Sequence, residues 1–555
     1  MRFVSSLFFL FCFSGLLAQN TESLPQGYFR NPLDIPIQLA GNFGELRPNH
    51  FHMGIDIKTQ QRQNLTVRAA ASGYVARIKI EPFGFGRAIY INHPNGFTTV
   101  YAHLNAFFPE LEKWVSEQQY QKESWAVYLE PPADLFPVKK GDKIALSGTT
   151  GGSLAPHLHF EIRRTADDVN INPLLFGLPI QDHSDPRIFR LAFYDRRQSL
   201  YEQSPRILPV KFVSSGHYNS VPYLVKLHAP LISVGLGSTD TQSGTPNQNG
   251  IFEASLSIDG KLCNAFRLDS LSYARTRYIN AHIDYKTKAR GGPYVQLLTE
   301  LPGYIHSIYT TSPSASVIDI SDGKPHQLEI RVKDAAGNTS LLQCKVQYSP
   351  IEADNSSSGN GKMFYPFMLD GFESDSCEFF IGERCLYDSV RIHYSASPSN
   401  VNESQTVSGT HHIGNDYIPL QEPFLIRIKP NRPLSDEEKK HIVMQWFAGS
   451  KKEVMPVTWQ DGWASAQCSN MGSFRLIFDT VPPVISLSGW SNGANLSRAD
   501  GIQFYVNDNL GALNGVRAEL DGKWICFSND KAKTFVYHFD EHCPRGSHVL
   551  SITAS

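Results

Sequence analysis

The sequence has no excess of charge of either sign, and after its first 18 residues it has no long hydrophobic run. Its 555 residues include 51 Lys and Arg and 53 Asp and Glu, which gives a formal net charge of −2. Proteins that bind nucleic acid usually carry a concentrated basic surface, so this balance argues against a nucleic-acid partner. A transmembrane helix needs about 20 consecutive apolar residues. The sequence therefore predicts no transmembrane segment in the mature chain.

Cysteine is scarce and is absent between residues 13 and 262. No two cysteines form a Cys-x-x-Cys pair, which argues against a cysteine zinc site. Beyond Cys12 the chain contains Cys263, Cys344, Cys377, Cys385, Cys468, Cys526 and Cys543. An odd number leaves at least one free thiol even if the others pair. An oxidising compartment permits bridges between the nearest pairs, Cys377 with Cys385 and Cys526 with Cys543, but the sequence does not determine connectivity.

The first 18 residues resemble a secretory signal peptide. Met1 and Arg2 form a short basic start, Phe3–Leu17 is an apolar run, and cleavage is expected after Ala18. The run is too short to span a membrane comfortably. Cys12 lies inside the run, without the small residues of a lipoprotein cleavage site, so no lipid anchor is expected. We therefore expect residues 1–18 to be removed from an exported protein.

The length predicts several domains, because 555 residues exceed what one hydrophobic core normally contains. A high content of aromatic residues, Gly and Pro is typical of β-rich domains with many turns. Beyond Ile180, short runs of alternating apolar and polar residues predict β-sandwich modules. Asp354–Lys362 is rich in Ser, Gly and Asn and is predicted to be a linker. The predicted boundaries are 19–177 for an N-terminal domain, then 178–350, 351–480 and 481–555 for three β modules.

Two of these modules share an internal similarity. Ser257–Lys261 resembles Glu519–Lys523, and His326–Val332 resembles His548–Ala554 with apolar residues at the same alternate positions. Asp334–Asn338 closes the first copy, as in immunoglobulin-like extracellular modules, which this region loosely resembles. The second copy stops at the end of the chain, inside the corresponding strand. We therefore expect the third module to be incomplete.

Two histidines stand two residues apart, directly after a glycine-rich turn. The turn Ser147–Ser153 leads into a short apolar strand predicted over Leu158–Ile162, and His157 and His159 lie at its start. Side chains at i and i+2 of a strand point to the same face, so the two imidazoles are expected to project together. Such a pair can be a metal site, a catalytic pair or a coincidence.

Three further polar residues lie upstream. His52 and Asp56 are four residues apart, which on a strand places them on one face, and Gly54 between them would leave room for an ion. Imidazole and carboxylate are both zinc ligands. The alternative is a hydrogen-bonded pair in a loop. His103 follows an apolar run, where a partly buried, hydrogen-bonded histidine is more common than a functional one.

Residues 106–137 interrupt the β pattern. Leu111, Trp114 and Val115 have helical spacing after Pro109, a residue that suits the first turn of a helix. This insertion is either a packed surface excursion or a wall or lid beside a cleft. The sequence leaves both interpretations open.

Five short elements within residues 40–175 resemble, in their order, the M23 (lysostaphin/LytM-type) metallopeptidases. They are His52-x-Gly-x-Asp56, Tyr101-Ala-His-Leu104, the Lys140-Gly-Asp142 turn, Gly148-Thr-Thr-Gly151 and His157-Leu-His-Phe160. The resemblance implies a small antiparallel β fold with a groove, one Zn²⁺ per chain, and cleavage of peptides in bacterial peptidoglycan. It also implies a place in the bacterial envelope, periplasmic or extracellular. The insertion departs from the shorter members of the family.

Carried over residue by residue, the resemblance implies that His52, Asp56 and His159 are zinc ligands. It implies that His103 and His157 are the catalytic histidines. Three protein ligands leave one tetrahedral position for water, as catalytic zinc requires. One histidine would then transfer protons while the other stabilises the oxyanion, and the sequence does not divide these roles.

The sequence thus predicts a mostly β protein, with a small antiparallel β-sheet peptidase domain that has a central groove, followed by β-sandwich (immunoglobulin-like) modules. The function predicted first is a secreted zinc endopeptidase that acts on stem or cross-bridge peptides of peptidoglycan. One alternative is a non-catalytic M23-like protein that binds or activates other wall hydrolases. Another is a scaffold or adhesion protein built on the β modules. All five positions are filled, which favours the enzyme, with targeting left to the β modules or to envelope protein partners.

Overall fold

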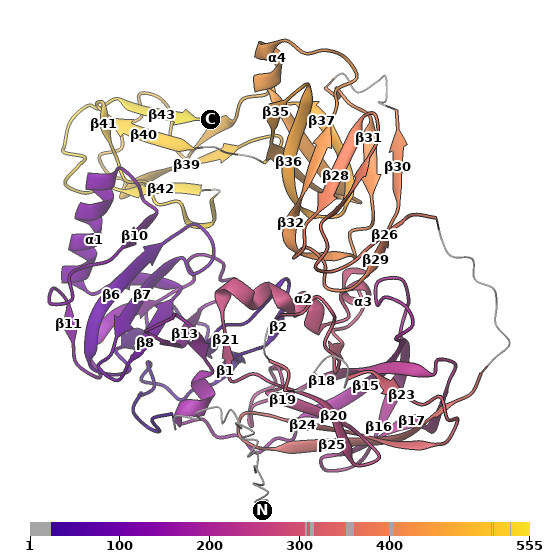
Figure 1. Ribbon diagram of the computed structural model, residues 1–555. Helices are drawn as coiled ribbons and strands as arrows, with labels where there is room; N and C mark the ends of the chain where they lie inside the picture. The colour runs from indigo at the N-terminus through magenta and orange to yellow at the C-terminus, as the bar shows by residue number, and fades with distance from the viewer. Residues whose placement is uncertain are drawn as a thin grey trace, which may run out of the picture.

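The computed structural model describes residues 24–305, 308–310, 316–350, 360–398, 405–511, 513, 515–532 and 534–555. The predicted signal peptide and most of the predicted linker at 354–362 lie outside these residues. The described chain is mostly β, as the sequence predicts, and it buries four large groups of apolar side chains in succession. We refer to the corresponding parts, in chain order, as the N-terminal, second, third and C-terminal domains (Figure 1).

The N-terminal domain is built on an antiparallel sheet in the order β1-β4-β13-β8-β7-β6-β10, and a smaller sheet, β5-β12-β9, packs with it. The turn His93–Gly96 joins β7 to β8, and Gly96 has the positive φ of 82° that such a turn requires. The elements are β1 (Leu39–Gly41), β2 (Leu46–Arg47), β3 (His50–Phe51), β4 (Ile55–Lys58), β5 (Thr66–Arg68), β6 (Gly73–Ile80), β7 (Arg87–Asn92), β8 (Phe97–Ala102), β9 (Leu104–Phe107), α1 (Pro109–Lys122), β10 (Val127–Leu129), β11 (Pro137–Val138), β12 (Lys143–Ser147), β13 (His157–Arg164), β14 (Asn170–Ile171) and η1 (Pro173–Phe176).

The insertion at 106–137 forms α1 and the edge strand β10. Leu111 and Val115 of α1 are buried in the core of the N-terminal domain, while β10 extends the main sheet by pairing with β6. The far end of α1 lies beside the C-terminal domain (Figure 1). There the ring of Tyr120 stacks on His542 at 3.6 Å between centroids. Glu123 also pairs with Arg517 at 2.7 Å. The insertion therefore packs against the N-terminal domain and also contacts the C-terminal domain.

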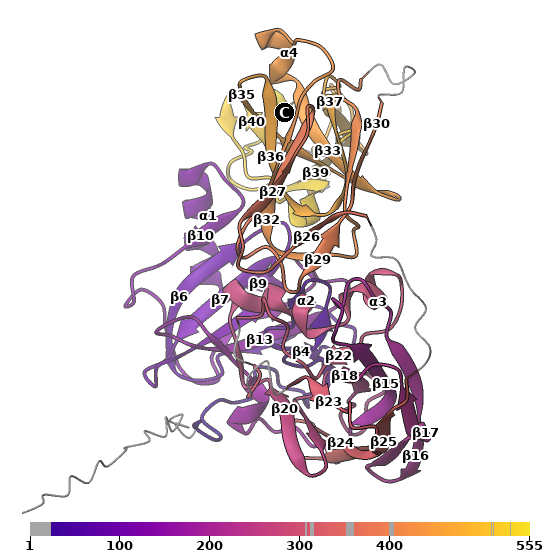
Figure 2. The ribbon, with the colours of Figure 1, turned by 45° about the vertical axis from the view of Figure 1, so that its right-hand side comes forward.

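The second domain packs its strands in the order β20-β19-β24-β25-β17-β16-β15-β18-β22, and its core also takes in Phe43, Phe51 and Met53 from the N-terminal domain. A short helical segment, η2 followed by α2, contacts the N-terminal domain at β3 (Figure 2). The elements are β15 (Arg187–Asp195), β16 (Arg206–Ser214), β17 (His217–Leu227), β18 (Leu231–Thr239), β19 (Glu253–Ile258), β20 (Lys261–Arg267), β21 (Ser270–Leu271), η2 (Tyr273–Tyr278), α2 (Ile279–His282), α3 (Tyr285–Ala289), β22 (Gln296–Leu297), β23 (Ile318–Asp319), β24 (His326–Lys333) and β25 (Thr339–Tyr348).

The third domain packs two five-stranded sheets around one core, in the orders β27-β28-β32-β36-β35 and β30-β31-β37-β33-β34. Arg277 of the second domain donates a hydrogen bond to the backbone oxygen of Leu420 at 2.7 Å and so joins the two domains. The elements are β26 (Lys362–Phe364), β27 (Asp370–Glu373), β28 (Cys377–Ile381), β29 (Val390–Ile392), β30 (Tyr394–Ser397), β31 (Thr410–Ile413), β32 (Pro419–Ile428), α4 (Asp436–Lys440), β33 (Ile442–Ala448), β34 (Lys451–Pro456), β35 (Thr458–Gln460), β36 (Trp463–Asn470) and β37 (Gly472–Phe478).

The C-terminal domain has two three-stranded sheets, β38-β39-β42 and β41-β40-β43, around a small core. It repeats a contact of the second domain. His326 bonds Asp259 at 2.7 Å there, and His548 bonds Asp521 at 2.7 Å here, so the similar segments have the same local structure. The elements are β38 (Val484–Ser488), β39 (Gly501–Asn507), β40 (Val516–Leu520), β41 (Lys523–Trp524), η4 (Asp530–Ala532), β42 (Thr534–His538) and β43 (Leu550–Ala554).

Two chemical expectations can be compared with the described residues. All seven cysteines beyond residue 23 carry free thiols, so neither bridge that the sequence left open, Cys377 with Cys385 or Cys526 with Cys543, is formed there. Across the same described part of the chain, every helix is too short or too polar to cross a membrane.

Candidate metal centre

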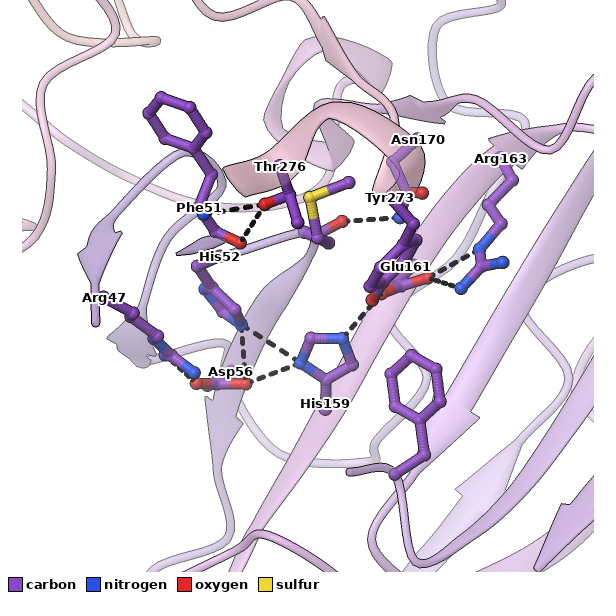
Figure 3. Close-up of polar contacts among 12 residues, drawn as sticks. Arg47, Phe51, His52, Asp56, His159, Glu161, Arg163, Asn170, Tyr273 and Thr276 are labelled. Carbon is purple, nitrogen blue, oxygen red and sulfur yellow. Dashed lines mark hydrogen bonds and ion pairs between the residues drawn. The ribbon is translucent and has the colours of Figure 1, made fainter. Parts of the chain in front are cut away.

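Two imidazoles and a carboxylate from separate segments converge below the η2 segment (Figure 3). Asp56 on β4 and His159 on β13 face each other as paired residues of neighbouring antiparallel strands. His52 comes from the loop before β4. The distances are 2.9 Å from His159 Nδ1 to Asp56 Oδ1, and 3.1 Å from His52 Nε2 to each of these atoms. All three side chains are buried.

The expectation that His52 and Asp56 share one face of a single strand is wrong. β3 ends at Phe51 and β4 begins at Ile55, so His52 lies in the loop between them. Gly54 in this loop was expected to leave room for an ion, but its surroundings are different. A Cβ there would lie 2.5 Å from the backbone oxygen of Phe160 and 3.0 Å from Nε2 of His159. The missing side chain therefore leaves room for β13 and the ring of His159.

The donor atoms fit a single zinc ion. With bonds of about 2.0–2.1 Å, tetrahedral zinc places its donor atoms about 3.3 Å apart, close to the distances observed. Burial alone would raise the pKa of Asp56, but His52, His157 and His159 around it hold that pKa well below its usual range. Burial lowers the pKa of His52 to about 4. Asp56 and His52 are thus in the forms in which they bind metals. Burial would lower the pKa of His159, but Asp56 and Glu161 raise it to about 9, so zinc binding at this imidazole would release a proton.

Outer hydrogen bonds fix which nitrogen of each imidazole faces the centre. His52 Nδ1 bonds the backbone oxygen of Asn42 at 2.7 Å, which leaves Nε2 for the centre. His159 Nε2 bonds Oε1 of Glu161 at 3.0 Å, which leaves Nδ1. Such outer partners orient metal-binding histidines and select their tautomer. Burial would raise the pKa of Glu161, but Arg163 and His159 hold it at about 2, so Glu161 stays ionised.

The two remaining histidines of the predicted site lie beside this group. The rings of His103 and His157 are 4.7 Å apart between centroids, and His157 Nε2 lies 3.4 Å from Asp56 Oδ1. His103 Nδ1 bonds the backbone oxygen of Thr150 at 2.8 Å, and His157 Nδ1 bonds that of Ala155 at 2.8 Å. Thr150 in the glycine-rich turn and Ala155 just after it therefore hold the two rings by Nδ1. Nε2 of His157 is left to face Asp56. The structure brings all five predicted site residues together.

Several supporting residues were missed by the sequence reasoning. Glu161 and Arg163 continue the alternation of His157 and His159 along β13, so the same i, i+2 rule could have found them. Arg163 pairs with Glu161 at 2.6 Å. Tyr273 of η2 donates a hydrogen bond of 2.5 Å to Glu161 from the second domain, and no local pattern predicts that contact (Figure 3).

The C-terminal domain contacts the other side of the centre. The backbone N–H of Gly151 donates to Asp530 Oδ1 at 2.6 Å, and Lys531 Nζ donates to the backbone oxygen of Thr149 at 2.9 Å. Lys531 N also donates to the backbone oxygen of Pro82 at 2.8 Å. The turn that holds His103 is therefore itself held by the last domain.

Comparison with known families agrees with this geometry. Residues 50–120 match the profile of peptidase family M23, a range that contains His52, Asp56 and His103. This part of the chain is similar to the M23 peptidases. Residues 368–479, in the third domain, match the profile of a Zu5-like domain. An M23-like domain followed by β modules is the arrangement that the sequence predicts.

Curated relatives match a part of the chain of 150–170 residues. An uncharacterized metalloprotease of Haemophilus influenzae is 32% identical over 170 residues, which cover 29% of this chain and 30% of the relative. A DD-carboxypeptidase/endopeptidase, Mpg, of Neisseria meningitidis is 32% identical over 157 residues, 28% of this chain and 27% of the relative. A peptidoglycan DD-endopeptidase, ShyA, of Vibrio cholerae is 25% identical over 150 residues, which cover 26% of this chain and 29% of the relative. The chain thus spans less than a third of the length of these relatives.

Two solved structures also match about a quarter of the chain. The catalytic domain of lysostaphin from Staphylococcus simulans has 22% identity and a TM-score of 0.20, over 25% of this chain and 92% of that one. A zinc containing peptidase from Vibrio cholerae has 25% identity and a TM-score of 0.20, and the match covers 26% of this chain and 39% of that one.

Proposed function

We propose that the protein is an exported zinc endopeptidase that hydrolyses peptide bonds in the stem or cross-bridge peptides of bacterial peptidoglycan. The observation that carries the proposal is the convergence of His52, Asp56 and His159 within 2.9–3.1 Å of one another, beside His103 and His157. The M23 profile match supports the reaction type. The name of one relative, a peptidoglycan DD-endopeptidase, supports the substrate.

In this proposal His52 Nε2, Asp56 Oδ1 and His159 Nδ1 hold one zinc ion per chain. When bound, zinc polarises the scissile carbonyl and lowers the pKa of water from about 15.7 to about 7. The protein contributes the orientation. Asn42 and Glu161 fix the two imidazoles, and Arg47 pairs with the second carboxylate oxygen of Asp56 at 2.5 Å.

His103 and His157 are the proposed catalytic residues. Both are anchored through Nδ1 to backbone oxygens, so each directs Nε2 to the space beside Asp56 and His159. Burial and the neighbouring imidazoles lower the pKa of His103 to about 3, which keeps the ring neutral. One ring takes a proton from the attacking water and gives it to the leaving amine, and the other donates a hydrogen bond to the oxyanion.

The place of action is proposed as the periplasm or the outside of the bacterial cell. The signal-like N-terminus supports export, and the peptidoglycan named for one relative supports a wall substrate. A net charge of −2 provides little attraction to an anionic wall. The β modules, including the Zu5-like domain, are therefore the proposed sites for contact with envelope partners.

The test uses the purified full chain and isolated sacculi, with released fragments identified by mass spectrometry. We expect about one zinc per chain by elemental analysis, release of peptides, and loss of release with a chelator. His157→Ala should keep the zinc and lose release, whereas His159→Ala should lose both. His217→Ala, an exposed histidine of the second domain, is the matched control. Zinc-loaded wild type that releases nothing would contradict the proposal and favour a binding or activating role.

A further inference from the structure

Three carboxylates meet where the N-terminal and second domains join. Asp182 lies in the segment that connects the domains, Asp240 follows β18, and Asp334 follows β24. One oxygen of each lies within 4.8 Å of the others. Asp240 and Asp334 are each only 4% exposed. Like charges this close and this deeply buried repel one another strongly unless a cation or a proton lies between them.

No basic side chain compensates this charge among the described residues. Within that part of the chain, none of the three carboxylates forms an ion pair with Lys, Arg or His. Burial and the charges of Asp334 and Asp182 raise the pKa of Asp240 to about 7. Burial is also the main cause that raises the pKa of Asp334. The cluster is therefore a place where added positive charge is favourable.

An unpartnered oxygen points to a ligand independently of the charges. Asp240 Oδ1 is fully buried and accepts no hydrogen bond in the described structure. Asn249 faces Asp240 across an isolated β-bridge, is 3% exposed, and its Oδ1 also lacks a partner. Directly opposed residues of an antiparallel bridge project to the same side. A buried oxygen without a donor destabilises the folded state, and a bound cation would remove that cost.

The other two carboxylates are held in place by donors. Asp182 Oδ1 accepts hydrogen bonds from the backbone N–H of Ser243 at 3.0 Å and from its hydroxyl at 3.1 Å. Asp334 accepts from the backbone N–H of Asn338 at 2.8 Å and from its amide at 2.6 Å. These bonds keep the carboxylates together despite their repulsion. The oxygens are thus organised in advance for a common ion.

We propose that Asp182, Asp240 and Asp334 form a structural Ca²⁺ site at the junction of the N-terminal and second domains. The donor atoms described are all oxygens, which suit a hard cation and not zinc, whose protein ligands are mostly nitrogen and sulfur. Calcium accepts six to eight oxygens in flexible geometry, including carboxylates, amide and backbone carbonyls, and water. Magnesium demands a near-ideal octahedron and keeps several of its waters, which suits a buried cluster less well.

The site has a structural consequence for the metal centre. Gln242, in the loop that Asp240 begins, bonds the backbone of Leu39 on β1 at 2.9 Å. At the other end of the loop, Gly250 exchanges two hydrogen bonds with the side chain of Asn42, at 2.7 and 2.8 Å. The backbone oxygen of Asn42 in turn holds His52 Nδ1. A cation on Asp240 therefore fixes the loop that supports a proposed zinc ligand.

The test is a calcium titration of the full chain after passage over a chelating resin, with zinc content checked afterwards. Tm and bound calcium are measured as CaCl₂ is raised into the millimolar range, which covers the affinities of extracellular calcium modules. We expect one calcium per chain and a rise in Tm of several degrees, because an ion that binds only the folded state stabilises it. MgCl₂ should have a smaller effect.

Asp240→Asn keeps the shape of the side chain and removes one charge. This variant should lose the calcium-dependent rise in Tm, and without calcium it should melt above the wild type because repulsion is reduced. Asp185→Asn, in the same connecting segment but outside the cluster, should respond as the wild type does. Absence of bound calcium and of a Tm shift in the wild type would overturn the proposal. A calcium response that persists in Asp240→Asn would also overturn it, and an equal response to MgCl₂ would overturn the assignment to calcium.

Discussion

Tyr273 of the second domain donates a hydrogen bond of 2.5 Å to Oε1 of Glu161, the carboxylate that also holds His159 Nε2 at 3.0 Å. Burial and the charge of Glu161 raise the pKa of Tyr273 well above its usual value, so its hydroxyl remains a donor. The orientation of a proposed zinc ligand therefore depends on a side chain outside the region that matches the M23 profile.

Tyr273→Phe should weaken zinc binding. The change removes the donor to Glu161 and leaves the ring in place, and loss of an outer partner typically costs 10–100-fold in metal affinity or activity. Zinc affinity is measured by competition with a chromogenic chelator. Tyr223→Phe, which removes a more exposed hydroxyl from Gln327 in the same domain, is the control. Equal zinc affinities of the two variants would show that the hydrogen bond from Tyr273 to Glu161 does not contribute to zinc binding.

Gly54→Ala should disturb both the fold and the metal centre. Its Cβ would lie 2.5 Å from the backbone oxygen of Phe160 and 3.0 Å from His159 Nε2, so β13 would have to move. Overpacking of this kind typically costs about 1–3 kcal/mol. We expect a lower denaturant midpoint and reduced zinc content. Gly515→Ala, where an added Cβ meets nothing within 4 Å, should leave both unchanged.

The buried His282 should make the protein acid-sensitive. Burial lowers its pKa from 6.5 to about 3, and its ring lies between the hydroxyl of Tyr309 and the amide of Gln296. Because the unfolded chain binds more protons than the folded one between these values, stability falls as pH falls below about 6.5. This residue alone should cost about 2 kcal/mol between pH 7 and pH 5.

Urea midpoints measured across this pH range check the prediction. His282→Gln cannot titrate and should show a shallower dependence on pH than the wild type, at some cost in stability at neutral pH. His217→Gln, at an exposed position, should keep the wild-type slope. Identical slopes for His282→Gln and the wild type would refute a major role for this buried imidazole.

Asp530→Ala should loosen the glycine-rich turn. It removes the charged acceptor of the Gly151 N–H, a bond of 2.6 Å, and hydrogen bonds to charged groups contribute about 1.5–3 kcal/mol. We expect hydrogen exchange in peptides covering 148–153 to accelerate by roughly 10- to 100-fold. Mass spectrometry measures this rate. Asp508→Ala is the comparison, because this carboxylate in the same domain accepts a hydrogen bond from Leu510 in its own loop. Equal exchange in both variants would contradict the contact.

The sequence was sufficient to predict five residues that the structure brings together, because all five lie in short recognisable motifs. The alternation of a strand places His157 and His159 together, and the order of the motifs supplies His52, Asp56 and His103. The same alternation contains Glu161, whose role was missed. Tyr273 could not have been found, because 112 residues separate it from Glu161 and only the packing of two domains brings them together. The loop position of His52 was missed for a similar reason, since its shape depends on contacts with Asn42 and β13.

The contact between α1 and the C-terminal domain closes the four domains into a ring. Tyr120 on His542 joins the last domain to the first, and Arg277 on Leu420 joins the second to the third. In an open string of domains each linker can act as an independent hinge. In a closed ring, rotation at one joint must be matched by rotation or rupture at another. Domain motions in this protein are therefore coupled mechanically, and a load applied to any one domain is shared by all four.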